Sequence, residues 1–377
     1  MIIQARAARP QITMDGKDYY TSLAPYFVSM SVEDNCDGKK ADDLEIRLAD
    51  RDKRFINDWA PQKGAFLDVG IIAERWFAPF AGAILLDCGR FWIDSVEFSL
   101  PDHTVSVKAT SIPTNTRIKG SVETRGWEEA NLKDLANQIA QENKMEAVDW
   151  QSDTNPRYLR TEQHEESALA FLMKRCNDAK LAVKVHRNKI IVYDEQKMEE
   201  DEAKFTLLYG NATGAIGASY RMAGGTFTST VVDKIKKAKV KHMDLETGEV
   251  QQGEAEDEED DGGEEDENDS NTSEDTDSES DGDGIGDPSL RAEEGSATQY
   301  NAADTLKAKS NLRDKNKHKF VATIHLSIGN PLIASGMTFN LKGVGQYDGK
   351  WFIESIKHEL GPAFTTDLAA RKCLTGY

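Results

Sequence analysis

The carboxylates between Asp277 and Asp287 are the residues of this 377-residue chain whose type and spacing come nearest to a metal site. Alternating acids followed by glycines resemble the first half of a calcium loop, in which oxygen ligands converge around a sharp turn. The match is incomplete, because Pro288 stands where a bidentate Glu should close the loop. A solvated acidic spacer is the simpler interpretation, and we expect no cofactor. The candidate calcium ligands are Asp277, Glu279, Asp281, Asp283 and Asp287.

Histidine and cysteine spacing offers no second site. The histidines form no HExxH or similar metal spacing, and His358 lies in an expected strand, where a structural histidine is the simpler interpretation. The four cysteines are scattered without a CxxC pair, which favours buried free thiols over disulfides or zinc ligands. The sequence also lacks a GxSxG elbow and a GxxxxGK[ST] phosphate loop. These patterns predict that the protein is not an enzyme.

The net charge of -20 belongs to one segment of the chain. Between His242 and Leu290 there is no Lys or Arg, and outside this stretch acidic and basic residues nearly balance. No basic stripe remains that would favour sequence-specific nucleic-acid binding. No apolar run approaches the ~20 residues of a membrane span, and the N-terminus has no apolar signal segment. We therefore expect protein partners, no membrane, and synthesis in a reducing cytoplasm.

Periodicity predicts two β-rich regions around a helical module, a mainly β fold with α/β modules (α+β). Helical spacing marks 132–140 and 168–179, with Glu162–Glu166 at the start of the second helix, and a hairpin turns at Arg187-Asn188. A further helix is expected over Ala302–Leu312. The expected domains are an N-terminal β-barrel (1–115), an α/β module (116–204), a strand-rich connection (205–245), a disordered acidic insert (246–295) and a C-terminal β-barrel (296–377).

Short runs of alternating or apolar residues, divided by turn residues, give the expected strands. The insert is almost free of large apolar residues, so it cannot offset the entropy cost of ordering. The dense aromatics between Trp59 and Trp92 either fill a barrel core or form a subunit interface. Strands are expected at 27–32, 43–48, 65–72, 91–98, 104–109, 226–232, 236–241, 319–326, 337–341, 350–357 and 364–371.

Two stretches of the sequence match the motif pattern of one protein family. The first runs from Glu162 to Cys176 and continues into a hairpin, and the second runs from Gly329 to Leu368. In this order they resemble the phage late control protein D family, the tail hubs related to the hub part of VgrG-type spikes. The resemblance covers most of the chain outside the acidic insert. The residues that carry it are Glu166, Ser167, Phe171, Leu172, Arg175, Gly336, Gly343, Asp348, Gly349, His358 and Thr366.

The resemblance implies a baseplate hub of a contractile phage tail or phage-like injection machine. It implies a homotrimer whose two barrels per subunit form a pseudo-sixfold ring, joining the tail tube or tube-initiator protein to the central spike beside the baseplate wedge proteins. The place implied is the virion tail baseplate or injection particle, assembled in the host cytoplasm. A carbohydrate-binding or adhesin-like tail module is the alternative. We expect Gly349→Val to damage folding, and deletion of Glu246–Gly295 to leave assembly intact.

Overall fold

The structure is a computed structural model that describes residues 5–38, 40–114, 116–213, 219–230, 237–243, 250–256, 289–290 and 316–373. The chain divides into two compact units. The first unit consists of Met1–Thr228 and Phe320–Cys373, and the second consists of Ser229–Lys319 and Leu374–Tyr377. The first unit contains almost all of the described side chains, so the site is built from it.

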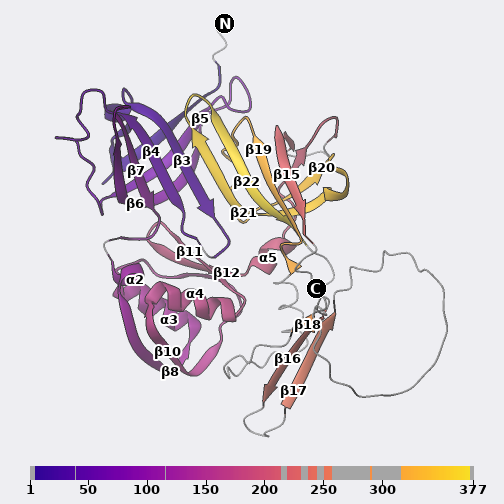
Figure 1. The fold of residues 1–377 in the computed structure, drawn as a ribbon. Helices are drawn as coiled ribbons and strands as arrows, with labels where there is room; N and C mark the ends of the chain where they lie inside the picture. The colour runs from indigo at the N-terminus through magenta and orange to yellow at the C-terminus, as the bar shows by residue number, and fades with distance from the viewer. Residues whose placement is uncertain are drawn as a thin grey trace, which may run out of the picture. The chain divides into compact units, whose positions relative to one another are not determined.

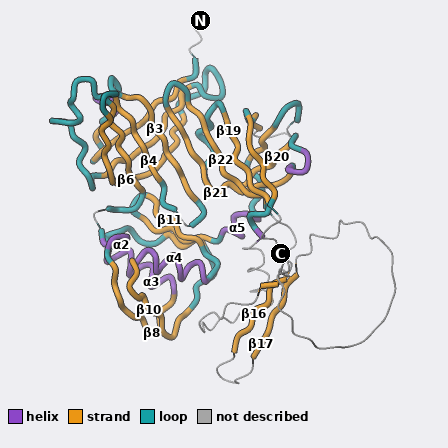
Figure 2. Tube along the Cα trace, viewed as in Figure 1, coloured by secondary structure: helices purple, strands orange, loops and turns teal. Residues whose placement is uncertain are grey.

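A single 14-stranded sheet joins the N-terminal and C-terminal β regions of the first unit (Figures 1 and 2). Its strands run in the order β14-β13-β20-β21-β3-β4-β7-β6-β5-β1-β2, and β22, β19 and β15 branch from β21. The strands are β1 (Ala7–Met14), β2 (Lys17–Asp18), β3 (Phe27–Asn35), β4 (Asp43–Ala49), β5 (Phe66–Glu74), β6 (Ile84–Ser99), β7 (Thr104–Thr110), β13 (Phe205–Leu208), β14 (Ser219–Arg221), β15 (Gly224–Ser229), β19 (Phe320–Leu326), β20 (Thr338–Lys342), β21 (Gly349–Leu360) and β22 (Phe364–Lys372).

Strand β21 connects the two regions because it has three partners. Its first residues pair with β20, its last six pair with β3, and β22 pairs with it along most of its length. The expectation of a mainly β fold is confirmed. The expectation of two closed barrels is not, because the order of the described strands ends at β14 and β2 without closing. A closed N-terminal barrel would require β3 to pair with β1 or β2. Instead, this edge of β3 pairs with β21, so the sheet continues into the C-terminal strands.

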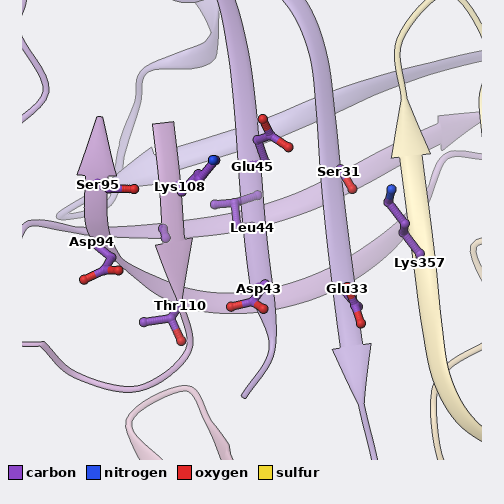
Figure 3. Close-up of a pocket in the computed structure, with 11 residues that line it drawn as sticks. Ser31, Glu33, Asp43, Leu44, Glu45, Asp94, Ser95, Lys108, Thr110 and Lys357 are labelled. Atoms are coloured by element: carbon purple, nitrogen blue, oxygen red, sulfur yellow. The ribbon is translucent and has the colours of Figure 1, made fainter. Parts of the chain in front are cut away.

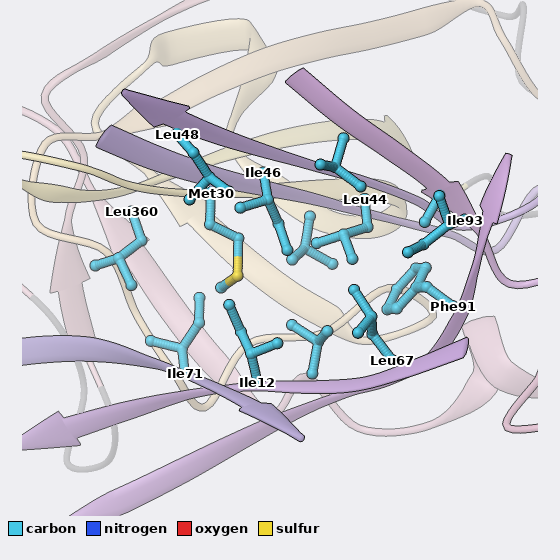
Figure 4. Close-up of a cluster of buried hydrophobic side chains, with 14 of the residues drawn as sticks. Ile12, Met30, Leu44, Ile46, Leu48, Leu67, Ile71, Phe91, Ile93 and Leu360 are labelled. Atoms are coloured by element: carbon cyan, nitrogen blue, oxygen red, sulfur yellow. The ribbon is translucent and has the colours of Figure 1, made fainter. Parts of the chain in front are cut away.

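The two larger apolar clusters of the described residues stabilise this sheet, and a small third one of Cys36, Ala182, Tyr193 and Phe352 lies against the α/β module. The first lies inside the curled N-terminal strands, where inward residues alternate with polar outward ones, as in Leu44, Ile46 and Leu48 of β4 (Figure 4). Leu360 and Phe364 from the C-terminal strands also belong to this cluster. The second cluster is formed by β13 and β19–β22. Its buried members are Phe205, Leu207, Met222, Ala322, Ile324, Leu326, Ile333, Phe339, Leu341, Trp351, Ile353, Ile356, Leu368 and Ala370.

An α/β module is inserted between β7 and β13. The two amphipathic helices α3 and α4 contact a two-stranded sheet, β8–β10, and a three-stranded sheet, β11-β12-β9. Both helices were predicted from their spacing and are confirmed; the domain boundaries remain a prediction. The elements are α2 (Arg117–Gly120), β8 (Val122–Asn131), α3 (Leu132–Glu142), β9 (Asp149–Gln151), β10 (Arg157–Ser167), α4 (Ala168–Asp178), β11 (Ala182–His186), β12 (Lys189–Tyr193) and α5 (Glu195–Glu200); elsewhere the first unit holds α1 (Tyr20–Leu23) and the short 3-10 helix η1 (Gly345–Tyr347).

Within this module the structure confirms one predicted feature, the hairpin, and contradicts another, the start of the second helix. The predicted hairpin joins β11 and β12, and both Arg187 and Asn188 have the positive φ that a type I′ turn requires. The stretch Glu162–Glu166, however, does not begin a helix but belongs to strand β10. A bulge between Gln163 and Glu166 disturbs the alternation along that strand, which is why its sequence resembled a polar helix start.

The second unit contains three described strands, β16 (Lys237–Met243), β17 (Val250–Glu256) and β18 (Ser289–Leu290). Strands β17 and β18 fall within the expected insert 246–295, whose bounds stay a prediction. The register of β17 on β16 sets Lys237 opposite Glu256 and Lys239 opposite Glu254, a pairing that overall composition hides. The rest of the insert and the expected helix over Ala302–Leu312 lie outside the described residues. No helix in the described part is long and apolar enough to cross a membrane.

Candidate functional site

The first group of motif residues fastens helix α4 to the β8–β10 sheet. The Ser167 hydroxyl oxygen accepts the backbone N–H of Ala170 at 3.2 Å and so caps the start of α4. One turn later the Phe171 ring stacks on Trp127 of β8, with ring centroids 4.9 Å apart and planes inclined by 11°. The Arg175 guanidinium lies 5.7 Å from the Phe171 centroid. These residues therefore position the helix.

The remaining two residues of the first motif also lie inside the module. Leu172 is fully buried on the inner face of α4. The backbone carbonyl of Glu166 accepts a hydrogen bond of 2.6 Å from the Gln163 side chain, which holds the bulge of β10. Arg175 also forms an ion pair of 3.2 Å with Asp178. The contacts that these motif residues make therefore all lie within the α/β module.

The second group of motif residues forms the turn before β21. The Asp348 carboxylate accepts the backbone N–H groups of Gly343 at 3.1 Å and Val344 at 2.6 Å. Gly343 has φ of +95°, and a Cβ there would lie 2.6 Å from the carbonyl oxygen of Tyr209. Gly349 has φ of +132°. Left-handed backbone and close approach together explain why this turn contains glycine and aspartate.

His358 and Thr366 meet in the interior, facing each other across β21 and β22. The His358 Nδ1 lies 2.9 Å from the Thr366 hydroxyl, which accepts the backbone N–H of Asn330 at 3.1 Å. Burial lowers the pKa of His358 to about 4, so the ring is neutral near pH 7. Gly336, with φ of +77°, packs against the Cys36 thiol. The geometry is that of a structural histidine.

A buried ion cluster joins the α/β module to the large sheet. Lys184 of β11 forms an ion pair with Asp34 of β3 and lies 3.3 Å from Asp42. Asp34 also accepts the backbone N–H of Ser335 at 3.1 Å. Burial acts to raise the pKa of Asp34, but the Lys184 ammonium outweighs it and leaves this pKa lowered. Asp42 lies 3.6 Å from the ring of His186 and is itself fixed by the backbone N–H of Asn35.

A second ion cluster attaches helix α5 to β22. Arg371 has no exposed surface, and its guanidinium pairs with Glu199, with Glu195 at 3.2 Å and with Glu354 at 3.0 Å. The same guanidinium lies 4.9 Å from the Phe352 ring. Burial acts to lower the pKa of Arg371, but the carboxylates beside it, Glu199 first, outweigh this and raise it. The module is thus attached through paired charges as well as apolar contacts.

Sequence reasoning missed both ion clusters. Alternation along β22 places Thr366, Leu368 and Ala370 inward, which should leave Arg371 in solvent. Arg371 is buried because α5 covers the other face, and no local pattern signals such a contact. The calcium candidates lie outside the described residues. Within the described residues, no group of three or more His, Cys, Asp or Glu side chains could hold a metal ion.

The described motif residues therefore position the elements of a fold that consists of one large sheet with an inserted α/β module. Solved phage tail proteins have this fold. A tail protein of Neisseria meningitidis MC58 matches 97% of this chain and 96% of its own, with a TM-score of 0.63 and 12% identity. The prophage MuSo2 43 kDa tail protein of Shewanella oneidensis matches 97% of this chain and 98% of its own, with a TM-score of 0.60 and 10% identity.

A third similar structure is the E. coli c3393 protein. It is described as a component of the type VI secretion system with structural similarity to the T4 bacteriophage tail proteins gp27 and gp5. It matches 97% of this chain and 78% of its own, with a TM-score of 0.52 and 10% identity. No protein-family model matches the sequence, and no curated protein is similar to it. At these identities the likeness concerns the fold, and at that level it confirms the resemblance to tail proteins.

Proposed function

We propose that this chain is a structural, non-enzymatic hub of a contractile phage tail or phage-like injection machine. In this role three copies form a ring in the baseplate that joins the tail tube to the central spike. One observation carries the proposal: the fold matches two solved tail proteins over nearly the whole of all three chains. A match of this extent includes the α/β module and both β regions, so it does not rest on a shared common subdomain.

The positions of the residues that could do chemistry support a structural role. His358 is buried and neutral at pH 7, and burial raises the pKa of the Cys36, Cys88 and Cys176 thiols to about 12. Thiols with such pKa values are poor nucleophiles. Buried ion pairs and the capped helix α4 instead fix how the elements of this chain pack together. A rigid subunit of this kind suits a closed rotational ring.

The mass of the purified full chain in solution tests the proposal. Light scattering should give about three times 41.9 kDa, and the trimer should take up a spike protein encoded beside it. A monomer that becomes a trimer only when the spike is added would also support the hub. A monomer indifferent to both the spike and the tube protein would overturn the proposal and favour the carbohydrate-binding alternative.

A glycan-binding assay separates that alternative. Trp59 is 41% exposed, but its ring is enclosed by Tyr26, Phe55 and the Arg54 guanidinium, which lies 5.1 Å from the ring centroid. Because Arg54 already occupies a face of the ring, we expect Trp59→Ala to leave glycan retention at background, as in the unaltered chain. Specific retention that Trp59→Ala abolishes would favour the carbohydrate-binding function instead.

A further inference from the structure

One row of side chains crosses five strands of the large sheet on the face opposite the first apolar cluster (Figure 3). The register sets Lys357 of β21 opposite Glu33 of β3, Glu33 opposite Asp43 of β4, and Asp43 opposite Thr110 of β7. Asp94 ends the row at the bulge in β6. These residues line a hollow of about 340 Å³.

The carboxylates of this row form no ion pair within the described residues. Glu33 and Asp43 face each other directly, an arrangement of like charges that destabilises a sheet. Within the described residues, Glu33, Asp43 and Asp94 make no side-chain hydrogen bond or ion pair, and neither does Lys357. Burial and then the Glu33 carboxylate raise the pKa of Asp43. The Lys119 and Lys40 ammonium groups act in the opposite direction but do not outweigh this. The three carboxylates of the row face only one lysine within it, Lys357, so negative charge is in excess.

The basic and acidic neighbours of the row are already engaged. The Lys108 ammonium, which also lines the hollow, pairs with Glu97 at 3.4 Å. Glu45 accepts hydrogen bonds from the Ser106 hydroxyl at 2.6 Å and from Arg47 at 3.0 Å. These pairs lie one register step further along the strands. The carboxylates without an ion pair are thus those of the row between Lys357 and Asp94.

Thr110 supplies an independent sign that the hollow is incomplete. Its side chain lies among the acids of the hollow in Figure 3, yet the residue is only 8% exposed. Its hydroxyl oxygen has no hydrogen-bond partner in the described structure. A buried hydroxyl without a partner costs about 1–3 kcal/mol, a cost that a donor bound in the hollow would relieve.

The spacing of the row selects the chemistry of the ligand. Within the part of the chain that the structure describes, no group of three or more His, Cys, Asp or Glu side chains could hold a metal ion, so a metal is not the ligand indicated here. A planar guanidinium has five N–H donors directed outward and no acceptor, so it can bridge acceptors on adjacent strands. We propose that this hollow binds an arginine side chain from a basic segment of a partner protein, with its guanidinium between Glu33 and Asp43 and one N–H donated to Thr110. The inference does not depend on the hub proposal.

Fluorescence anisotropy of a short labelled peptide with adjacent arginines tests this binding with the full-length chain at low salt. Asp43→Asn should weaken binding about tenfold, the effect of losing one charged hydrogen bond. Thr110→Val should weaken peptide binding about fivefold. Because this substitution leaves the net charge unchanged, any nonspecific attraction of the peptide to the acidic insert is the same in both proteins. Glu128→Gln is the matched control, because it removes an exposed carboxylate from the outer face of β8.

The same peptide with citrulline in place of arginine should bind only at background. Equal affinity of the Asp43→Asn and Glu128→Gln proteins would overturn the proposal. So would a lysine peptide that binds as tightly as the arginine peptide, or Ca²⁺ that displaces the arginine peptide at the hollow.

A stability measurement on the free protein separates a binding role from a structural one. Asp43 faces the like charge of Glu33 across the sheet. Asp43→Asn should therefore raise the Tm of the unliganded chain while it lowers the affinity for the peptide. A lower Tm for Asp43→Asn would show that the carboxylate stabilises the fold, and it would overturn the proposal.

Discussion

Gly343 and Gly349 both have backbone angles that L side chains rarely adopt, but their surroundings differ. A Cβ on Gly343 would meet the carbonyl oxygen of Tyr209 at 2.6 Å, and that carbonyl belongs to the backbone after β13. A Cβ on Gly349 would meet only the flexible end of Lys372 at 3.3 Å. The two glycines of one motif are therefore required for different reasons, one by steric exclusion and the other by dihedral angle.

Alanine at these two positions should distinguish the two requirements. We expect Gly349→Ala to lower the free energy of unfolding by about 1–2 kcal/mol through strain alone. Gly343→Ala should cost more, because the backbone at Tyr209 must also move, and Gly349→Val should exceed Gly349→Ala. Urea unfolding followed by tryptophan fluorescence measures all three. A smaller loss for Gly343→Ala than for Gly349→Ala would contradict the steric argument.

The neutral, buried His358 predicts a dependence of stability on pH. Its pKa in the folded chain is about 4, below the ordinary value of 6.5, so the unfolded chain binds the proton more readily. Stability is therefore unaffected by this group above pH 6.5 and falls as the pH drops from 6.5 towards 4. The loss is about 1.4 kcal/mol per pH unit. Thermal unfolding of His358→Gln between pH 7 and pH 5 should show a shallower slope than the unaltered chain; parallel slopes would refute this assignment.

At the scale of elements, helix α4 depends on its cap. The Ser167 hydroxyl satisfies the N–H of Ala170, which has no partner within the helix. We expect Ser167→Ala to lower the free energy of unfolding by about 1 kcal/mol and Ser167→Thr to retain most of it. Chemical denaturation of both variants provides the measurement. An alanine variant as stable as the parent would show that packing of Phe171 and Leu172 fixes the helix start without the cap.

Helix α5 depends on Arg371, which is covered completely while it pairs with three carboxylates. Arg371→Met should cost about 3–5 kcal/mol, because Glu195 and Glu199 would lose the buried guanidinium that pairs with them. Adding Glu199→Met should recover part of that loss, since apolar replacements can substitute for a buried pair. Amide hydrogen exchange in α5 should be faster in the single variant than in the unaltered chain, and slower in the double variant than in the single one. An unchanged α5 in the single variant would show that the ion cluster does not hold the helix.

The elements differ in how far their sequences reveal them. Helices α3 and α4 and the hairpin β11–β12 were predictable, because their periodicity and turn residues are local signals. Strand β10 was not, because its bulge and its charged residues resemble the polar first turn of a helix. The ion clusters at Lys184 and Arg371 were not predictable either. Their partners come from distant parts of the chain, and alternation along a single strand does not show what covers its second face.

At the scale of the whole molecule, the two larger apolar clusters draw their residues from the first unit. Their members all lie between residues 12 and 370 and outside the acidic insert. We therefore expect deletion of Glu246–Gly295 to leave the Tm of the first unit unchanged, although it removes strands β17 and β18. Calorimetry gives the Tm, and light scattering shows whether the mass of the assembly is kept. A lower Tm or a smaller assembly would show that the insert contributes to the fold or to the ring.

The triple pairing of β21 has a consequence for how the chain is made. Strand β3 emerges early from the ribosome, but its partner residues Ser355–Leu360 are translated hundreds of residues later. At a translation rate of roughly 5–20 residues per second, the edge of β3 that pairs with β21 stays unpaired for tens of seconds during synthesis. An open strand edge invites pairing with a neighbouring nascent chain. Polysomes that carry this message are therefore where the protein is most exposed to misassembly, and a chaperone that covers β3 would act there.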